Sequence, residues 1–425
     1  MTMIVGLFLF FLLTGMPAAF AIGLPSLLFF IQSDFVPISV AVQRIAGATQ
    51  SFPLLAVPFF VLAGNLMNVT GITPRLIKFS TLCTGWIAGG LAHVCILLSA
   101  IMGGVSGAAV ADAAMEARIL GPTMIERGFS KGYTAGVIAL GSLITATIPP
   151  SIGLILYGYV GNVSIGRLFI AGIVPGLMMM VFLMITAWLI AKKRGYQPEL
   201  KEIPKGREVL KGLNDAKWAI LFPVFLIVGI RFGIFTPSEA GAFCVLYALI
   251  IGIFVYREMT WQAIWKVLEQ SVGDIGMIML IIMLSSMLGY AIIFDQVPQK
   301  MSSFMVGLSD NPTVILFMIL GFLVVSGMFV ESTVLVLLLT PIFVPVITHI
   351  GIDPVHFGIL MMSLVTMGSM TPPVGVAMFT VCGLLKCSTH EYVAESLPFV
   401  FTIVIVVAIL VFIPDVVLFL PNALM

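Results

Sequence analysis

Two proline pairs interrupt long apolar stretches of this sequence, and the residues around them suit a small cation. Residues 141–151 contain Pro149-Pro150, and residues 368–375 contain Pro372-Pro373. Each proline lacks a backbone donor and clashes with the carbonyl one turn earlier, so two in a row force a helix to unwind. The freed carbonyls and the nearby threonine hydroxyls are hard oxygen donors, which suit Na⁺ as they suit other hard cations.

A second type of break precedes each proline pair. Residues 101–112 (IMGGVSGAAVAD) and residues 326–333 (SGMFVEST) place small and polar residues between short apolar arms. This pattern is typical of a re-entrant helical hairpin, whose tip is tolerated in a membrane only where it lines a cavity or binds a ligand. We therefore expect each half of the chain to contain a hairpin followed by a broken helix.

Carboxylates accompany both hairpins. Asp112 and Glu116 are four residues apart and therefore lie on one face of a helix, with Arg118 nearby, and Glu331 lies at the second break. Charge within a membrane is costly and indicates function by default. We expect Asp112 and Glu331 to contribute to substrate binding, and Glu331 could instead position the tip or bind a cation. An ion-pair cluster at a membrane boundary is the alternative for Asp112 and the favoured interpretation for Glu116 and Arg118.

A constant offset relates the two halves. Five glycines and prolines recur 223 residues later over about 47 positions: Gly104 and Gly327, Pro122 and Pro345, Gly128 and Gly351, Pro149 and Pro372, and Pro150 and Pro373. Transporters are commonly built from such repeats. The sequence therefore predicts a first repeat at 1–191, a linker at 192–217 and a second repeat at 218–425.

The composition requires a membrane environment for these elements. Of the 425 residues, 60% are hydrophobic and 9% are charged, and the net charge is +1. Soluble domains carry roughly 25% charged residues, so the low charged fraction excludes a soluble protein. The net charge near zero leaves no basic surface for a nucleic-acid partner. The apolar runs are continuous and do not alternate, which predicts an all-α polytopic membrane protein in a lipid bilayer.

Segment boundaries follow from hydropathy and charge. The hairpins are expected at about 85–126 and 312–350, and the broken helices at about 133–160 and 355–385. Residues 1–31 are expected to form the first span. The linker holds eight of the twenty basic residues, so the positive-inside rule places it in the cytoplasm.

Enzymatic and ATP-driven classes lack their motifs in this sequence. It contains no G-x-x-x-x-G-K-[ST] phosphate loop and no HExxH metal motif. We therefore expect a non-enzymatic protein that uses an ion gradient instead of ATP. The alternative is an ion-conducting channel or a non-transporting structural subunit; a channel would conduct ions without a binding protein.

The sequence resembles the large membrane subunit of tripartite ATP-independent periplasmic (TRAP) transporters. The matching stretches are SGAAVADAAMEARILGPTMIERGFSKGY (106–133), IPPSIGLILYG (148–158), FTPSEAGA (235–242), GMFVESTVLVLLLTPIFVPV (327–346) and TPPVG (371–375), and the likeness covers essentially the whole chain. It implies an elevator-type transporter with two inverted repeats in a bacterial inner membrane. It also implies a separate four-helix membrane subunit and a soluble periplasmic substrate-binding protein.

The resemblance further implies two sodium sites, each between a hairpin tip and the neighbouring broken helix. Carried over, the first uses Gly103, Gly104, Ser106, Thr145, Ile148 and Pro149, and the second uses Ser326, Gly327, Thr333, Gly368, Met370 and Thr371. The two tips differ, because Ser106 falls on Phe329 and Ala108 falls on Glu331. The two sites therefore cannot have identical ligands.

The substrate implied by the resemblance is an organic acid, either sialic acid or a C4-dicarboxylate, and the sequence leaves that choice open. Half-helix N-termini carry partial positive charge and suit a carboxylate. We therefore expect substrate binding at Pro150, Ser151, Pro372 and Pro373, besides the two carboxylate positions.

Overall fold

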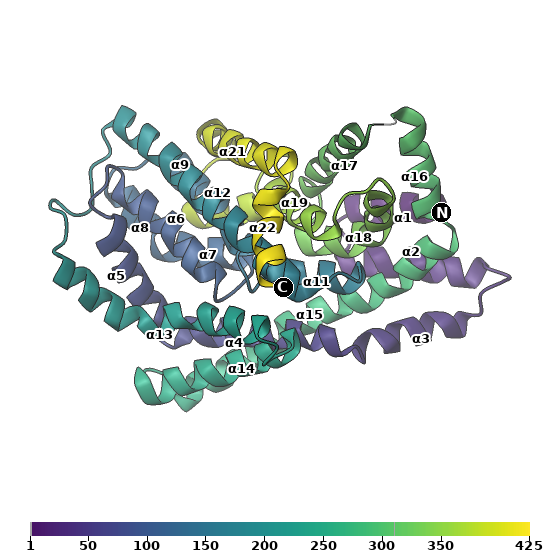
Figure 1. Ribbon diagram of the computed structural model, residues 1–425, viewed down its shortest axis with the longest axis horizontal. Coiled ribbons are helices and arrows are strands. Elements are labelled where there is room, and N and C mark those ends of the chain that lie inside the picture. The colour runs from purple at the N-terminus through teal and green to yellow at the C-terminus, as the bar shows by residue number, and fades with distance from the viewer. Residues whose placement is uncertain (1, 310) are drawn as a thin grey trace.

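Helices make up all the regular structure in residues 2–309 and 311–425, which the computed structural model describes (Figure 1). The first half contains α1 (Thr2–Leu13), α2 (Ala18–Gln32), α3 (Ile38–Thr49), the 3-10 turn η1 (Phe52–Leu55), α4 (Ala56–Val69), α5 (Ile72–Thr84), α6 (Gly90–Gly103), α7 (Ala109–Ile119), α8 (Gly121–Glu126), α9 (Lys131–Gly141), α10 (Leu143–Thr147), α11 (Ile152–Val160) and α12 (Ile165–Arg194).

The second half contains α13 (Gly206–Arg231), α14 (Pro237–Ile250), the π-helical turn η2 (Ile251–Val255), α15 (Trp261–Phe294), α16 (Val297–Leu308), α17 (Pro312–Gly327), α18 (Ser332–His349), α19 (Pro354–Gly368), α20 (Val376–Leu385), α21 (Thr389–Phe412) and α22 (Asp415–Leu424). From α6 and α17 onward, the elements of the two halves occur in a similar order.

The described helices include seven that are long and apolar enough to cross a membrane. The count rises to eight if α9–α10 and α11, which meet at a bend of 46°, form one broken span. Hairpin arms α6 and α17 have 14 and 16 residues, shorter than the about 20 that a span needs. These two arms are therefore too short to span alone, whereas α18 of the second hairpin, with 18 residues, is one of the seven long apolar helices.

Both predicted helix interruptions are present. In the first half, α10 ends at Thr147 and α11 begins at Ile152; in the second, α19 ends at Gly368 and α20 begins at Val376. Both prolyl bonds within the pairs are cis. A new side-chain cap starts the helix after the first break, where the Ser151 hydroxyl accepts from the amide of Leu154 at the start of α11.

The prediction of one span over residues 1–31 is wrong. The chain turns after α1 and starts again as α2, with Gly15 at a φ of 82° and Pro17 at the N-cap of α2. Glycine adopts that left-handed conformation without steric cost, and proline supplies no amide to continue the first helix. Hydropathy alone does not reveal this turn because both flanking segments are apolar.

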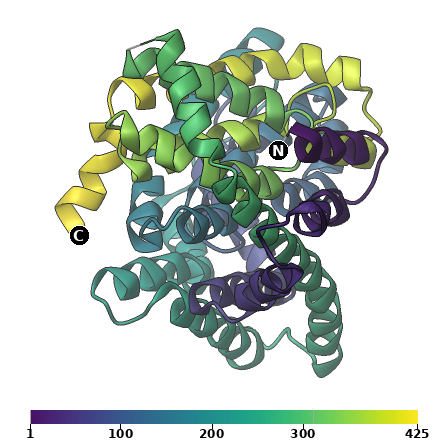
Figure 2. The same ribbon diagram turned by 90° about the vertical axis from the view of Figure 1, so that its right-hand side faces the viewer.

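The helices form two groups. The frame group comprises α1–α5 and α13–α15, in which α4 packs on α14, α5 on α13, and α15 on α2, α3 and α4. The hairpin group comprises α6–α12 and α17–α22, in which α9 packs on α21 and α17 packs on α19. In Figures 1 and 2 the helices α13 and α14 occupy the lower side of the molecule, and α21 lies on the upper side.

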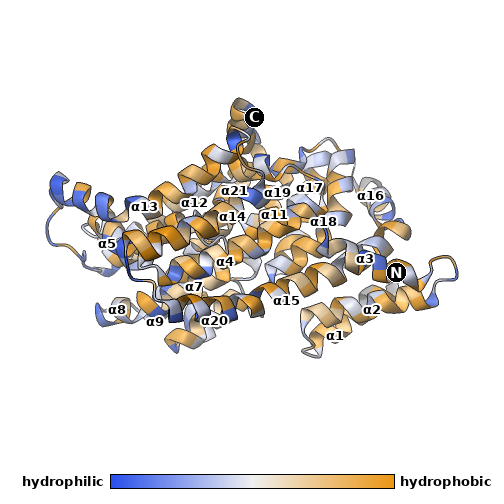
Figure 3. Cartoon of the chain, turned by 90° about the horizontal axis from the view of Figure 1, so that it is seen from below, coloured by the Kyte–Doolittle hydropathy of each residue, from blue (hydrophilic) through white to orange (hydrophobic). Residues whose placement is uncertain are grey.

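Hydrophilic residues gather near the start of α13, at one end of the molecule (Figure 3). There the linker is tied to the turn between α5 and α6. The Glu199 amide donates to the Gly85 carbonyl at 2.8 Å, and the Gly89 amide donates to the Tyr196 carbonyl at 3.1 Å. The Arg127 guanidinium pairs with Glu199 at 2.8 Å. The linker, the α5–α6 turn and the end of α8 therefore form one connected corner.

Candidate functional site

The first hairpin tip packs directly on the first break. Gly107 has a φ of 64°, and a Cβ atom there would collide with the Pro150 carbonyl oxygen. A Cβ atom on Gly103 would meet Thr145 Cα at 3.1 Å and Ile148 Cβ at 3.0 Å. Glycine is required at the tip because the two backbones approach too closely for a side chain.

The first break leaves carbonyl groups without their helical donors. In a continuous helix, residues 149 and 150 would donate to the carbonyls of Thr145 and Ala146, but both positions are proline and cannot. Both carbonyls belong to buried residues. The break therefore offers hard oxygen atoms at a site shielded from bulk water.

The Thr145 hydroxyl connects the broken helix to both arms of the first hairpin. Its oxygen lies 2.9 Å from the Ser99 carbonyl on α6 and 2.6 Å from a carboxylate oxygen of Asp112 on α7. Asp112 is 2% exposed, and within the described residues its second oxygen has no hydrogen-bond partner. The carboxylate therefore lies inside the protein beside Thr145.

Glu116 extends this buried cluster one helical turn further. The Cys95 thiol donates to it at 2.8 Å, and the Ser99 hydroxyl donates at 2.9 Å. The expectation of a boundary ion-pair cluster is wrong, because Glu116 is fully buried while Arg118 is exposed. Ser99 and Cys95 were missed at the sequence level; their spacing of four, matching that of the two carboxylates, was the available signal.

The second hairpin tip also packs closely on its broken helix. A Cβ atom on Gly368 would lie 2.6 Å from Gly327 Cα. The Met328 carbonyl accepts hydrogen bonds from the amides of Val374, at 3.2 Å, and Gly375, at 3.0 Å. Backbone hydrogen bonds therefore join this tip to its break.

The carbonyls at the second break have donors. Gly368 O accepts from both the amide and the hydroxyl of Thr371, each at 2.9 Å. The Ser369 carbonyl accepts from Ala377 at 3.0 Å, and the Met370 carbonyl accepts from the Tyr392 hydroxyl at 2.7 Å. Each carbonyl keeps a second lone pair, so these bonds reduce its capacity to bind a cation without abolishing it.

Glu331 caps α18. Its carboxylate accepts from the Val334 amide at 3.2 Å and from the hydroxyls of Thr333 at 2.9 Å and Ser332 at 3.1 Å. An acidic N-cap satisfies free amides of the first turn and complements the helix dipole. These contacts fix the carboxylate at the second tip, next to Thr333 of the expected second sodium site.

The remaining expected site residues lie around the two tips and breaks. Gly104 packs on Pro223 of α13, and the Ser106 hydroxyl lies 3.4 Å from the Met102 carbonyl. The Ser326 carbonyl accepts from two tip amides. The four prolines differ in exposure: Pro149 and Pro150 are buried, Pro372 is half-buried and Pro373 is exposed.

The two breaks are brought together by crossed contacts between the halves. Helix α7 of the first hairpin packs on α20 beyond the second break, and α18 of the second hairpin packs on α11 beyond the first. Helices α10 and α19, which lead into the breaks, also touch. Each junction also has its own oxygen donors, with Thr145 and Asp112 at the first and Glu331 and Thr371 at the second, and such donors suit hard cations.

Comparisons with known proteins agree with this architecture. Residues 5–416 match the family model described as the tripartite ATP-independent periplasmic transporter, DctM component. The sialic acid TRAP transporter large permease protein SiaM of Vibrio cholerae is 38% identical over 413 residues, covering 97% of this chain and 96% of that protein. The C4-dicarboxylate TRAP transporter large permease protein DctM of Rhodobacter capsulatus is 33% identical, covering 99% and 98%.

A solved structure shares the fold at low sequence identity. The YdaH transporter of Alcanivorax borkumensis superposes with a TM-score of 0.61 at 12% identity, over 91% of this chain and 90% of that one. The match to the DctM model over nearly the whole chain, with relatives above 30% identity, shows the family. The chain belongs to the large permease family of TRAP transporters, a family of multi-pass membrane proteins.

Proposed function

We propose that this chain is the permease subunit of a sodium-coupled secondary transporter that imports an organic acid delivered by a binding protein. The observation that carries the proposal is the crossed contact of α7 with α20 and of α18 with α11. Helix α7 corresponds to α18, and α11 corresponds to α20, so an exchange of the two halves converts one contact into the other. Two repeats related by a two-fold axis require this symmetry. Matching helices also begin 222 to 224 residues apart.

The proposed coupling ions are two Na⁺, one at each junction of a hairpin tip and a break. At 100 mV one net charge moving inward releases about 2.3 kcal/mol. A tenfold sodium gradient adds about 1.4 kcal/mol for each ion. Two Na⁺ with one monoanion would therefore supply roughly 5 kcal/mol, enough for an accumulation above about a thousandfold.

The proposed movement is an elevator displacement of the hairpin group against the frame group. The division of the helices into these groups supports it, because both tips and both breaks lie in the hairpin group. The frame group would stay fixed in the inner membrane together with the small four-helix subunit. Substrates named for relatives, sialic acid and C4-dicarboxylates, define the candidate acids for this chain.

Uptake by the reconstituted three-part complex tests this function. Proteoliposomes would receive radiolabelled sialic acid or succinate with the binding protein outside, under an inward sodium gradient or an equal potassium gradient. We expect accumulation of one acid that requires both Na⁺ and the binding protein. Uptake without sodium dependence would refute the coupling, and ion flux without the binding protein would favour a channel.

A further inference from the structure

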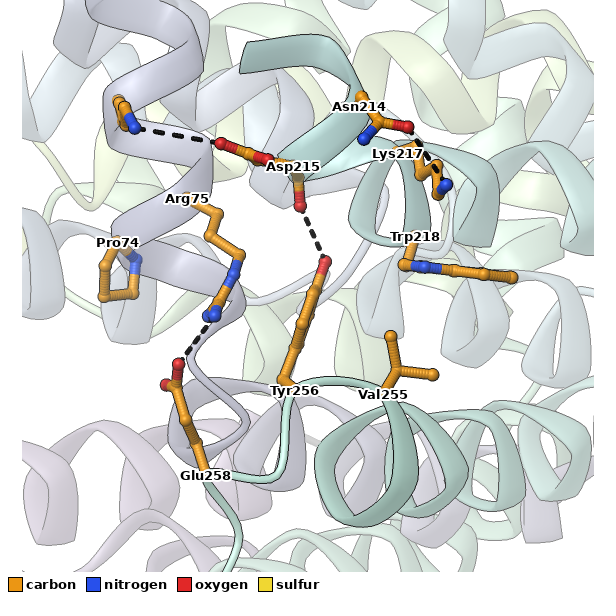
Figure 4. A pocket seen from close by; sticks show the side chains of 10 residues that line it. Pro74, Arg75, Asn214, Asp215, Lys217, Trp218, Val255, Tyr256 and Glu258 are labelled. Atoms are coloured by element: carbon orange, nitrogen blue, oxygen red, sulfur yellow. Dashed lines mark hydrogen bonds and ion pairs between the residues drawn. The ribbon is translucent and has the colours of Figure 1, made fainter. Parts of the chain in front are cut away.

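A polar pocket lies in the frame group, away from the hairpin tips. It has a volume of about 650 Å³ and opens between α5, the beginning of α13 and the segment that follows η2 (Figure 4). Its lining includes three basic residues, two acidic residues and two aromatic rings: Arg75, Lys78 and Lys217, Asp215 and Glu258, and Trp218 and Tyr256.

One wall of the pocket is a completed ion pair. The Arg75 guanidinium donates to Glu258 and to the Gly71 carbonyl, each at 2.7 Å, and lies 3.9 Å from the centre of the Tyr256 ring. The Tyr256 hydroxyl donates to the Asp215 carbonyl at 3.1 Å. These contacts join α5 to α13 and to the segment after η2. The negative charge of Glu258 is paired with Arg75.

The two lysines keep unused donors. Lys78 Nζ is 3.7 Å from Asp215, beyond hydrogen-bond distance, and its side chain is 64% exposed. Lys217 Nζ donates to the Asn214 side chain at 3.0 Å instead of pairing with a carboxylate. An ammonium group has three donors, so both lysines can bind an additional anion in the pocket.

The pocket lies where the basic segment gives way to the apolar run of α13. Lys217 ends the basic linker segment, and the apolar run of α13 starts directly after it with Trp218. Tryptophan and tyrosine are enriched at headgroup depth, and basic residues at the cytoplasmic face. The neighbouring Phe254 and Trp261 are 69% and 76% exposed, so apolar surface continues beyond the pocket.

We propose that this pocket binds the phosphate of an anionic phospholipid from the cytoplasmic leaflet. Lys78 and Lys217 bind the phosphate oxygens, and the acyl chains lie on the exposed apolar surface near Phe254. Basic pockets between membrane helices on the cytoplasmic side are suited to such headgroups. The bound lipid bridges α5 and α13 and so stabilises the frame group.

Lipid titration of the full-length protein tests the site. The protein would be titrated with phosphatidylglycerol in neutral detergent, and retained lipids would be counted by native mass spectrometry. The double variant Lys78→Gln/Lys217→Gln is expected to need about 30-fold more lipid for half-saturation. The matched control Lys193→Gln/Lys211→Gln removes the same charge from exposed positions of the same basic segment and is expected to bind as the wild type does.

Three results would overturn the proposal. Equal phosphatidylglycerol retention by the pocket variant and the wild type would exclude these lysines as ligands. An equal loss in the control variant would indicate general surface charge. Displacement of the lipid by millimolar glycerol phosphate, with no need for acyl chains, would assign the pocket to a soluble phosphate. None of these measurements requires transport, so failure here is separable from failure of the proposed function.

Discussion

The two hairpins meet their broken helices through different chemistry. In the first half, the Thr145 hydroxyl links α10 to Ser99 and Asp112 on the two hairpin arms. In the second half, the Met328 carbonyl accepts the amides of Val374 and Gly375. The first junction therefore depends on polar side chains, and the second depends on the backbone.

The second hairpin also serves as an internal control for the first. At the offset of 223 residues, the positions of Ser99, Asp112 and Glu116 carry Phe322, Leu335 and Leu339. The second hairpin forms with these apolar residues, so the fold does not need a polar cluster there. Since burying carboxylates is costly, the cluster in the first half indicates a functional requirement.

The largest expected effect comes from adding a side chain where the first hairpin tip touches the first break. Gly107→Ala would force a methyl group against the Pro150 carbonyl, in a backbone conformation that alanine disfavours. We expect substrate uptake to fall more than about tenfold, because a loss of about 1.4 kcal/mol in the free energy of packing the tip on the break lowers the packed population about tenfold. Gly128→Ala is the matched control, with a φ of 89° and no neighbour within 4 Å among the described residues. Equal uptake by the two variants would contradict the tip contact.

The next largest effect is expected at the hydroxyl that joins the first junction. Thr145→Val keeps the side-chain shape but leaves Asp112 and the Ser99 carbonyl without this hydroxyl, at a cost of about 1–3 kcal/mol. We expect the thermal unfolding midpoint to fall and the half-saturating Na⁺ concentration to rise about tenfold. Thr147→Val is the control, because that buried hydroxyl bonds within its own helix to the Leu143 carbonyl. A wild-type sodium response in Thr145→Val would exclude the first site.

Removing charge without changing shape sharpens the comparison further. Asp112→Asn should raise the half-saturating Na⁺ concentration about threefold to tenfold, because a nearby carboxylate stabilises a bound cation. Binding would be followed by ²³Na line broadening or by sodium-dependent uptake. The control Asp274→Asn lies in the frame group, where the Asp274 carboxylate accepts from Asn65, and it should leave the half-saturating Na⁺ concentration unchanged. An unaltered sodium affinity in Asp112→Asn would mean that the carboxylate does not act on the ion.

The smallest effect is expected in the second junction. Thr371→Val removes a hydroxyl that donates to the Gly368 carbonyl, but the Thr371 amide continues to donate to it. We expect about a threefold rise in half-saturating Na⁺, less than for Thr145→Val. Sodium titrations of both variants in the same liposomes would decide. A larger effect at Thr371 would reverse the proposed ranking of the sites.

The sequence was sufficient to predict the breaks and the hairpins because their signals are local. Proline pairs unwind helices wherever they occur, and the glycine-rich segment 101–107 marks a close backbone approach. The split between α1 and α2 was not predicted, since the turn at Gly15 lies between two apolar segments. The sequence therefore identifies helix interruptions best where a proline pair or a polar residue marks them.

The bonding at each junction could not be predicted because it depends on tertiary contacts. The Tyr392 hydroxyl reaches the Met370 carbonyl from α21, and the Ala377 amide reaches back to Ser369 across the break. Neither donor belongs to the motif that suggested the site. The contribution of Ser99 to the first cluster has the same origin, since it requires α6 and α7 to face each other.

The corner formed by the linker and the α5–α6 turn limits how the two helix groups can move. Two of the three chain passages between the groups meet there, held by the bonds from Glu199 to Gly85 and from Gly89 to Tyr196. The third passage runs through α16, near the opposite end of the molecule (Figure 1). If the hairpin group moves as proposed, the connecting chain must absorb the displacement at this corner and at α16.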